Sequence, residues 1–275
     1  MIISNLKFIE DGDFVILSAE CGIRHFGTDE IYFKLNKDYK NFVVQDYTPF
    51  LTSLLIPSMK LGEDIYIDGT VSEKVYSNLE KIMQLVCSWD IGLKKIKITV
   101  KGFTKEGFLP KYNTSFFSGG VDSFYTFLNN KSKNIETDYL ILANGYDINL
   151  QNKYLWKLTK DNIEQVSKEQ SVKLIEIESN IRDLIEPIVP WGYTHGGCLV
   201  ALGLLLRKEV KNVYIPSTYS IDQLFNWGTH PDLDYLWSSE YTNFIHDGAD
   251  KIRLEKIRLI SNNNFSALSS LSKTP

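Results

Sequence analysis

The residues best suited to chemistry form one short run from Ser118 to Ser123, which reads Ser-Gly-Gly-Val-Asp-Ser. Paired glycines let the backbone turn sharply and bring several N–H groups to one spot, where they can bind an anion. The two serines add hydroxyl donors, and Asp122 adds a carboxylate that suits a magnesium ion on phosphate oxygens. These residue types predict a cradle for phosphate groups.

The flanking residues predict a strand before this run and a helix after it. The run Asn113–Phe117 favours a strand, and apolar residues then recur with helical spacing at positions 121, 124, 125 and 128. The positive end of that helix would face the turn and strengthen anion binding. A tight turn with an N-cap is the plainer interpretation, and the strand–turn–helix context favours the phosphate cradle.

The run differs from the common nucleotide-binding loops, because it lacks the lysine of GxxxxGK[ST] and the spacing of GxGxxG. It resembles instead the PP-loop of the N-type ATP pyrophosphatases, also called adenine nucleotide α-hydrolases. The resemblance covers roughly residues 113–260, and members of this superfamily include asparagine synthetase, tRNA thiolases and 7-cyano-7-deazaguanine synthase. It implies that ATP phosphates lie on Ser118, Gly119, Gly120, Val121, Asp122 and Ser123, with Mg²⁺ on Asp122.

The resemblance also implies an activity. The enzyme would adenylate a carboxylate or amide oxygen of a small-molecule or peptide-like acceptor, with release of pyrophosphate, and a nucleophile would then displace AMP. A sulfur nucleophile would produce a thioamide or thiocarbonyl, whereas a nitrogen nucleophile would produce an amide or nitrile. A donor protein is one possible source of the sulfur or the nitrogen. A module of the same fold that binds ATP without turnover is the alternative, although such relatives generally lack the Asp-Ser pair in the loop.

Several residues outside the loop are further candidates. Asn144 ends the predicted strand 139–144 and is a candidate for nucleotide binding. Asp147 follows the strand and could bind ribose, magnesium or substrate, or form only an Asx turn. Arg253 and Lys256 share a helix face and could clamp the leaving pyrophosphate, or lie on a solvated face.

Two other segments also carry reactive types. In Trp-Gly-Tyr-Thr-His-Gly-Gly-Cys, Thr194 is the expected N-cap of a buried helix over residues 199–206. His195 could then serve as a general base or phosphate donor. Cys198, near the helix N-terminus, could be a nucleophile or sulfur carrier, or only a buried packing residue. The loop 226–240 carries His230, Asp232 and Asp234, whose types can bind a metal ion but also occur in ordinary turns. Its tryptophans, Trp227 and Trp237, could line a substrate pocket or fill the core.

The remaining pattern predicts an α/β protein in two parts. Residues 1–105 read as a small α+β domain with short strands at 2–9, 14–21, 31–35, 41–44, 63–67 and 96–100. Within it, residues 49–59 are apolar and irregular, and Ser72 caps an amphipathic helix. Residues 106–275 alternate strands and helices, which predicts a parallel-sheet PP-loop domain with its ligands at the carboxyl ends of the strands.

Composition narrows the functional class. A net charge of −4 over 275 residues gives no chain-wide basic footprint for nucleic acid, and the sequence offers neither a signal peptide nor an apolar run long enough to span a membrane. The three cysteines form no CxxC pair, which excludes a Cys₄ metal site. Several members of the superfamily do carry such pairs, so the sequence departs from them here. Three unpaired thiols also suit a reducing cytoplasm. The oligomeric state is open, with a homodimer among the expectations.

Overall fold

One ten-stranded sheet runs through the chain. The computed structural model describes residues 1–23, 27–105 and 107–263, so the predicted polar tail lies outside it from residue 264 onward. The strand order is β10-β9-β6-β7-β8-β3-β2-β1-β4-β5, and most neighbouring strands are parallel. The protein is therefore α/β, as predicted, with a large and mostly parallel sheet of Rossmann-like character.

The second half of the sheet contains only parallel pairs. Its strands are β6 (Tyr112–Phe116), β7 (Tyr139–Asn144), β8 (Lys173–Ser179), β9 (Val210–Pro216) and β10 (Asn243–Asp247). The chain adds β7 and β8 on one side of β6 and then crosses over to add β9 and β10 on the other. This reversal of strand order between β6 and β9 is a topological switch point, where open α/β sheets bind ligands.

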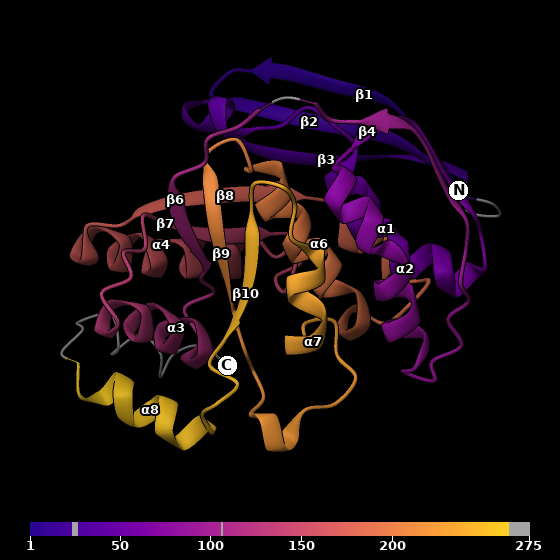
Figure 1. Ribbon diagram of the computed structural model, residues 1–275. Helices are drawn as coiled ribbons and strands as arrows, with labels where there is room; N and C mark the ends of the chain where they lie inside the picture. The colour runs from indigo at the N-terminus through magenta and orange to yellow at the C-terminus, as the bar shows by residue number, and fades with distance from the viewer. Residues whose placement is uncertain (24–26, 106, 264–275) are drawn as a thin grey trace.

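Helices cover both faces of this half (Figure 1). One face carries α3 (Val121–Ser132), α4 (Lys153–Gln170) and α8 (Arg253–Ser261), and the other carries α5 (Ile181–Ile185), α6 (Trp191–Leu205) and α7 (Pro231–Asp234). The alternation of side chains along β7 matches this arrangement, because Leu140 and Leu142 pack with α3 and α4 whereas Ile141 joins the core on the other face. Three short 3-10 helices complete the described part of the chain: η1 (Lys37–Phe42), η2 (Ile221–Gln223) and η3 (Tyr235–Trp237).

The N-terminal residues extend the same sheet. β1 (Ile2–Asp11), β2 (Phe14–Ile23) and β3 (Gly27–Asn36) pair antiparallel, and β4 (Ile65–Val71) and β5 (Ile98–Phe103) follow in parallel beyond β1. β3 also pairs antiparallel with β8, placing Phe33 opposite Ser179. Residues on both sides of position 105 thus share one sheet and one hydrophobic cluster, while the division into two domains stays a prediction.

Two helices pack under the N-terminal strands. α2 (Glu73–Cys87) begins as predicted, since the Ser72 hydroxyl accepts a hydrogen bond from the Val75 N–H at 3.1 Å. α1 (Thr48–Leu61) corrects the prediction of an irregular segment at 49–59. Pro49 lies in its first turn, where proline is tolerated, and Pro57 costs one hydrogen bond inside the helix. Every residue from Thr48 to Met59 is buried, so the helix has no polar face to reveal its period.

Other boundaries differ in smaller ways. The predicted strand at 41–44 is wrong, because the chain there leaves η1 and runs without strand pairing. β10 was not predicted, since its sequence Asn-Phe-Ile-His-Asp is short and mostly polar. None of the described helices combines the length and apolar character that crossing a membrane requires.

Candidate functional site

A pocket of about 490 Å³ opens at the carboxyl ends of β6, β7 and β9, at the topological switch point. Its walls come from the turns after β6 and β7, one face of α4, the first three turns of α6 and the loop after β9. Volumes of this size hold small organic ligands or cofactors. The pocket is therefore the candidate site, and the predicted residues can be judged by whether they reach it.

The turn after β6 brings four of its six predicted residues to the pocket, namely Ser118, Gly120, Asp122 and Ser123. Gly119 has φ +78°, a left-handed conformation that favours glycine, and Gly120 is the N-cap of α3. The first N–H groups of α3 have no partner within the helix and lie at its positive end. Gly119 and Val121 shape the turn and are not among the residues that line the pocket. The Ser123 hydroxyl donates to the Gly120 carbonyl at 2.9 Å, which ties the turn to the helix.

Two cations from α8 meet the Asp122 carboxylate. Lys256 Nζ lies 3.0 Å from Asp122 Oδ1, and Arg253 Nη1 lies 3.5 Å from Oδ2. The structure therefore joins Arg253 and Lys256 to the phosphate-type turn, across about half of the chain. Helix α8 reaches this place because it packs alongside α3 after the chain leaves β10.

The end of β7 places one predicted residue at the pocket and turns the other away. Gly145 has φ +87°, and a side chain there would lie 2.1 Å from the Ser179 carbonyl oxygen. The sharp turn presents Asp147 on the pocket rim, where its carboxylate accepts a hydrogen bond from Trp191 Nε1 at 3.2 Å. Asn144 is buried, does not line the pocket, and donates to Glu178 Oε2 at 3.0 Å. The structure thus places the Asn144 side chain outside the pocket lining, and nucleotide binding by it stays a prediction.

His195 lines the pocket from α6 with a defined tautomer. Its Nδ1 lies 3.0 Å from the Gly192 carbonyl oxygen, which can only accept, so we assign the proton to Nδ1 and a lone pair to Nε2. The ring lies between Trp191 and Trp227, with centroid distances of 6.2 and 5.2 Å. Burial lowers the pKa of the imidazole below 6.5, and the Asp147 carboxylate opposes this shift. His195 is therefore neutral near pH 7, as a general base must be.

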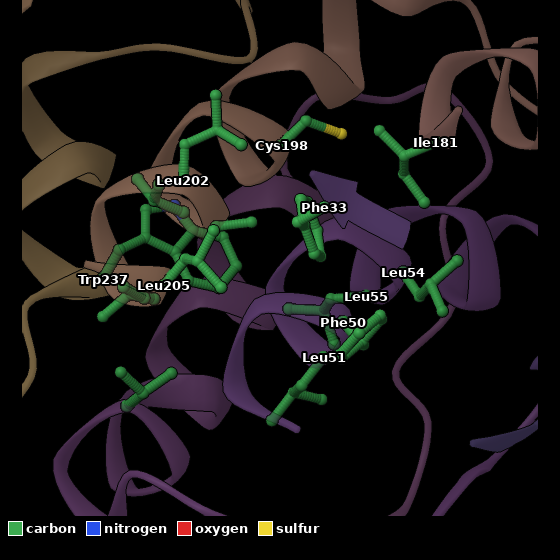
Figure 2. Close-up of a cluster of buried hydrophobic side chains, with 14 of the residues drawn as sticks. Phe33, Phe50, Leu51, Leu54, Leu55, Ile181, Cys198, Leu202, Leu205 and Trp237 are labelled. Carbon is green, nitrogen blue, oxygen red and sulfur yellow. The ribbon is translucent and has the colours of Figure 1, made fainter. Parts of the chain in front are cut away.

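Cys198 does not meet the expectation of a reactive thiol. Helix α6 begins at Trp191 with Pro190 as its N-cap, so Thr194 lies inside the helix and Cys198 lies two turns from its start. The thiol is fully buried in the hydrophobic cluster that also holds Phe33 (Figure 2), and it does not line the pocket. Burial raises the pKa of the Cys198 thiol well above its ordinary value. A nucleophilic or carrier role is thereby corrected to packing.

Close packing explains why α6 begins at Trp191, before Gly196 and Gly197, whereas the sequence predicted a helix over residues 199–206. A side chain at Gly196 would lie 1.7 Å from the Gly228 carbonyl oxygen, and one at Gly197 would lie 2.5 Å from the Thr52 carbonyl oxygen of α1. The glycines therefore let two segments approach the helix, and tertiary packing overrides their low helix propensity. The same approach brings Trp227 and Thr229 to the pocket.

Other pocket residues escaped the sequence analysis. Trp156 and Thr159 face the pocket from α4 together with Leu155, at the spacing of one helix face, whereas the apolar ring of Tyr154 nearby is 82% exposed. The spacing of Leu155, Trp156 and Thr159 could have shown that these residues share a helix face. Apolar residues on the neighbouring face of α4 hid this pattern.

His230, Asp232 and Asp234 of loop 226–240 are neighbours, but they are engaged in local hydrogen bonds. His230 accepts from the Asp232 N–H, and Asp234 is buried against His246 with Oδ2 2.7 Å from Nδ1. Within residues 1–23, 27–105 and 107–263 no group of three or more histidines, cysteines or carboxylates could hold a metal ion. Trp237 is core, whereas Trp227 lines the pocket.

The arrangement suits a phosphorylated organic ligand. A glycine turn at a helix N-terminus, the Asp122 carboxylate and a neutral imidazole line one pocket with apolar and aromatic walls. Arg253 and Lys256 pair with Asp122 but are not among the residues that line the pocket. No protein-family model, curated protein or solved structure matches the chain.

Proposed function

We propose that the protein is an ATP-dependent, AMP-forming enzyme of the PP-loop type, a ligase or a sulfurtransferase. The observation that carries this proposal is the position of the Ser118–Ser123 turn: it opens α3 at the switch point of the sheet, inside a pocket of about 490 Å³. Helix N-termini with glycine turns bind phosphate, and switch points bind nucleotides. The strand order alone leads one to expect a crevice at this edge, and the glycine turn supplies the N–H donors that suit a phosphate there.

The walls of the pocket divide among the parts of the proposed reactants. The triphosphate would lie on the N–H groups that open α3, between Ser118 and Asp122. The adenine would lie over the strip formed by the end of β7 and the face of α4, where Leu142, Trp156 and Thr159 offer an apolar surface to a flat ring. The acceptor would occupy the α6 side, between His195 and Trp227.

Asp122 fits the magnesium ion that accompanies ATP. Its side chain is 18% exposed at the pocket, and Mg²⁺ in nucleotide sites commonly takes one or two carboxylates together with phosphate oxygens. When bound, Mg²⁺ would neutralise charge on the phosphates.

The chemistry follows from positioning and charge. An acceptor oxygen attacks the α-phosphorus, an O–P bond forms, and the bond to the pyrophosphate oxygen breaks. The chain would orient the two reactants and place positive charge from Arg253 near the leaving pyrophosphate. His195 Nε2 can then take the proton that the nucleophile loses as AMP departs. No described cysteine lines the pocket, so a sulfur nucleophile would have to come from a separate donor.

Product analysis tests the proposal. The full chain is incubated with ATP, Mg²⁺ and fractionated metabolites, and nucleotides are separated by chromatography. AMP and pyrophosphate in equal amounts, released only with an acceptor fraction, are expected. ADP and phosphate as products would overturn the mechanism, and tight ATP binding with no turnover in any fraction would favour the ATP-sensing module instead.

A further inference from the structure

The two oxygens of the Asp122 carboxylate have unequal partners. Oδ1 lies 3.0 Å from Lys256 Nζ, a normal distance for a charge-assisted hydrogen bond. Oδ2 lies 3.5 Å from Arg253 Nη1, which is too long for one. The lysine side chain is 1% exposed and the arginine side chain 61% exposed, so the two ion pairs differ in both geometry and burial.

Lys256 is held on several sides. Its Nζ also donates to the Ser217 carbonyl oxygen at 2.5 Å and lies 5.7 Å from the centre of the Tyr125 ring. The turn at Gly248, with φ +89°, closes over it, because a side chain there would lie 3.0 Å from Tyr125 and 3.6 Å from Lys256 Cε. A buried ammonium persists only when it is paired, and leaving this place would break both hydrogen bonds.

Arg253 has the opposite character. It is the first residue of α8, and its guanidinium reaches Asp122 from the solvent side. An exposed ion pair of this length contributes little free energy, so the guanidinium can change partners readily. Its planar fork also matches phosphate oxygens better than an ammonium does.

We infer that the two cations have different roles: Lys256 is a positioning residue that fixes Asp122 through Oδ1, and Arg253 contacts the phosphates. On ATP binding Arg253 would leave Oδ2 for the phosphate oxygens, and Oδ2 would become free for the metal ion. This inference rests on the proposed ATP function and divides the expected pyrophosphate clamp into a fixed and a mobile part.

A double-mutant cycle separates the two roles. ATP binding to the full chain is measured by calorimetry, with Mg²⁺ and with a chelator, for Lys256→Met and Arg253→Gln, each alone and combined with Asp122→Asn. If Lys256 acts through Asp122, its substitution changes the affinity less than about twofold once Asp122 is already Asn. Arg253→Gln is expected to weaken ATP binding about tenfold in either background, because it removes a direct charged contact.

Arg258→Gln is the matched control, since Arg258 is an exposed arginine of the same helix. If Lys256→Met alone does not fold, the test rests on comparing Asp122→Asn with the double variant Asp122→Asn/Lys256→Met, in which no buried charge is left unpaired. A full tenfold loss from Lys256→Met in the Asp122→Asn background would show direct phosphate contact and overturn the inference, while leaving the ATP function standing. Failure of the wild-type chain to bind ATP would instead overturn the proposed function.

Discussion

The backbone of Gly228 lies where a side chain of Gly196 would be: a Cβ at Gly196 would come 1.7 Å from the Gly228 carbonyl oxygen. This contact seats the loop after β9 against the second turn of α6. The loop then supplies Trp227 and Thr229 to the pocket that His195 lines from the helix. One wall of the candidate site therefore depends on the lack of a side chain at one position.

The first prediction follows from this contact. Gly196→Ala should lower the free energy of unfolding by about 1–3 kcal/mol and weaken ligand binding, because backbone atoms must move to make room. Gly107→Ala is the control, since nothing lies within 4 Å of a side chain at that position. Thermal unfolding and ATP titration measure both effects, and equal behaviour of the two variants would contradict the proposed packing.

The second prediction concerns the buried ion pair. Asp122→Ala should abolish turnover and also lower the stability by roughly 2–3 kcal/mol, because Lys256 is left with a buried and incompletely paired charge. Asp122→Asn retains an oxygen for Lys256 and should lose turnover at a smaller cost in stability. Denaturant unfolding and AMP release are the measurements. Wild-type turnover in both variants would remove Asp122 from the site.

The third prediction uses the buried thiol. Cys198→Ala should leave AMP and product formation unchanged and lower the stability by about 1 kcal/mol, because it removes one buried atom and leaves a small cavity. Thiol-reactive reagents should modify Cys87 before Cys198 in the folded protein, since Cys87 is only partly buried. Loss of product with AMP release intact would restore the sulfur-carrier hypothesis.

The fourth prediction concerns pH. Burial lowers the pKa of His195 below its ordinary 6.5, so between these two values the unfolded chain binds a proton that the folded chain does not. Stability therefore falls as pH drops through 6.5 towards the folded pKa, and is unaffected by this group above that window. His195→Gln should flatten the stability profile in the acid range below pH 6.5 and slow product formation. A profile that matches the wild type would contradict the assignment of a neutral imidazole with a lowered pKa.

The fifth prediction tests the division at residue 105. A fragment of residues 106–275 would expose the β8 edge that pairs with β3 and the α6 face that packs on α1. It would also leave Arg207 without Asp46, its buried partner. We expect this fragment to lack a cooperative thermal transition, whereas the full chain has one. Cooperative unfolding of the isolated fragment would establish an independent domain.

Local signals in the sequence determined the parts that depend on a few neighbouring residues. The glycines of the Ser118–Ser123 turn, the strand before it and the helix after it were predicted because backbone freedom and apolar spacing act over one or two turns. The Ser72 cap and the strand Tyr139–Asn144 follow from the same kind of local preference. The α/β class could be read from the alternation of such elements.

Only the tertiary structure decided which of these residues meet. Lys256 reaches Asp122 because α8 packs on α3, whereas Asn144 turns to Glu178 and Cys198 is buried two turns into α6. Helix α1 and the early start of α6 form because burial and close backbone packing outweigh the local effects of proline and glycine. Pairing of β3 with β8 joins segments that lie far apart in the chain. Contacts of this range depend on the whole arrangement of elements, which no short stretch of sequence contains.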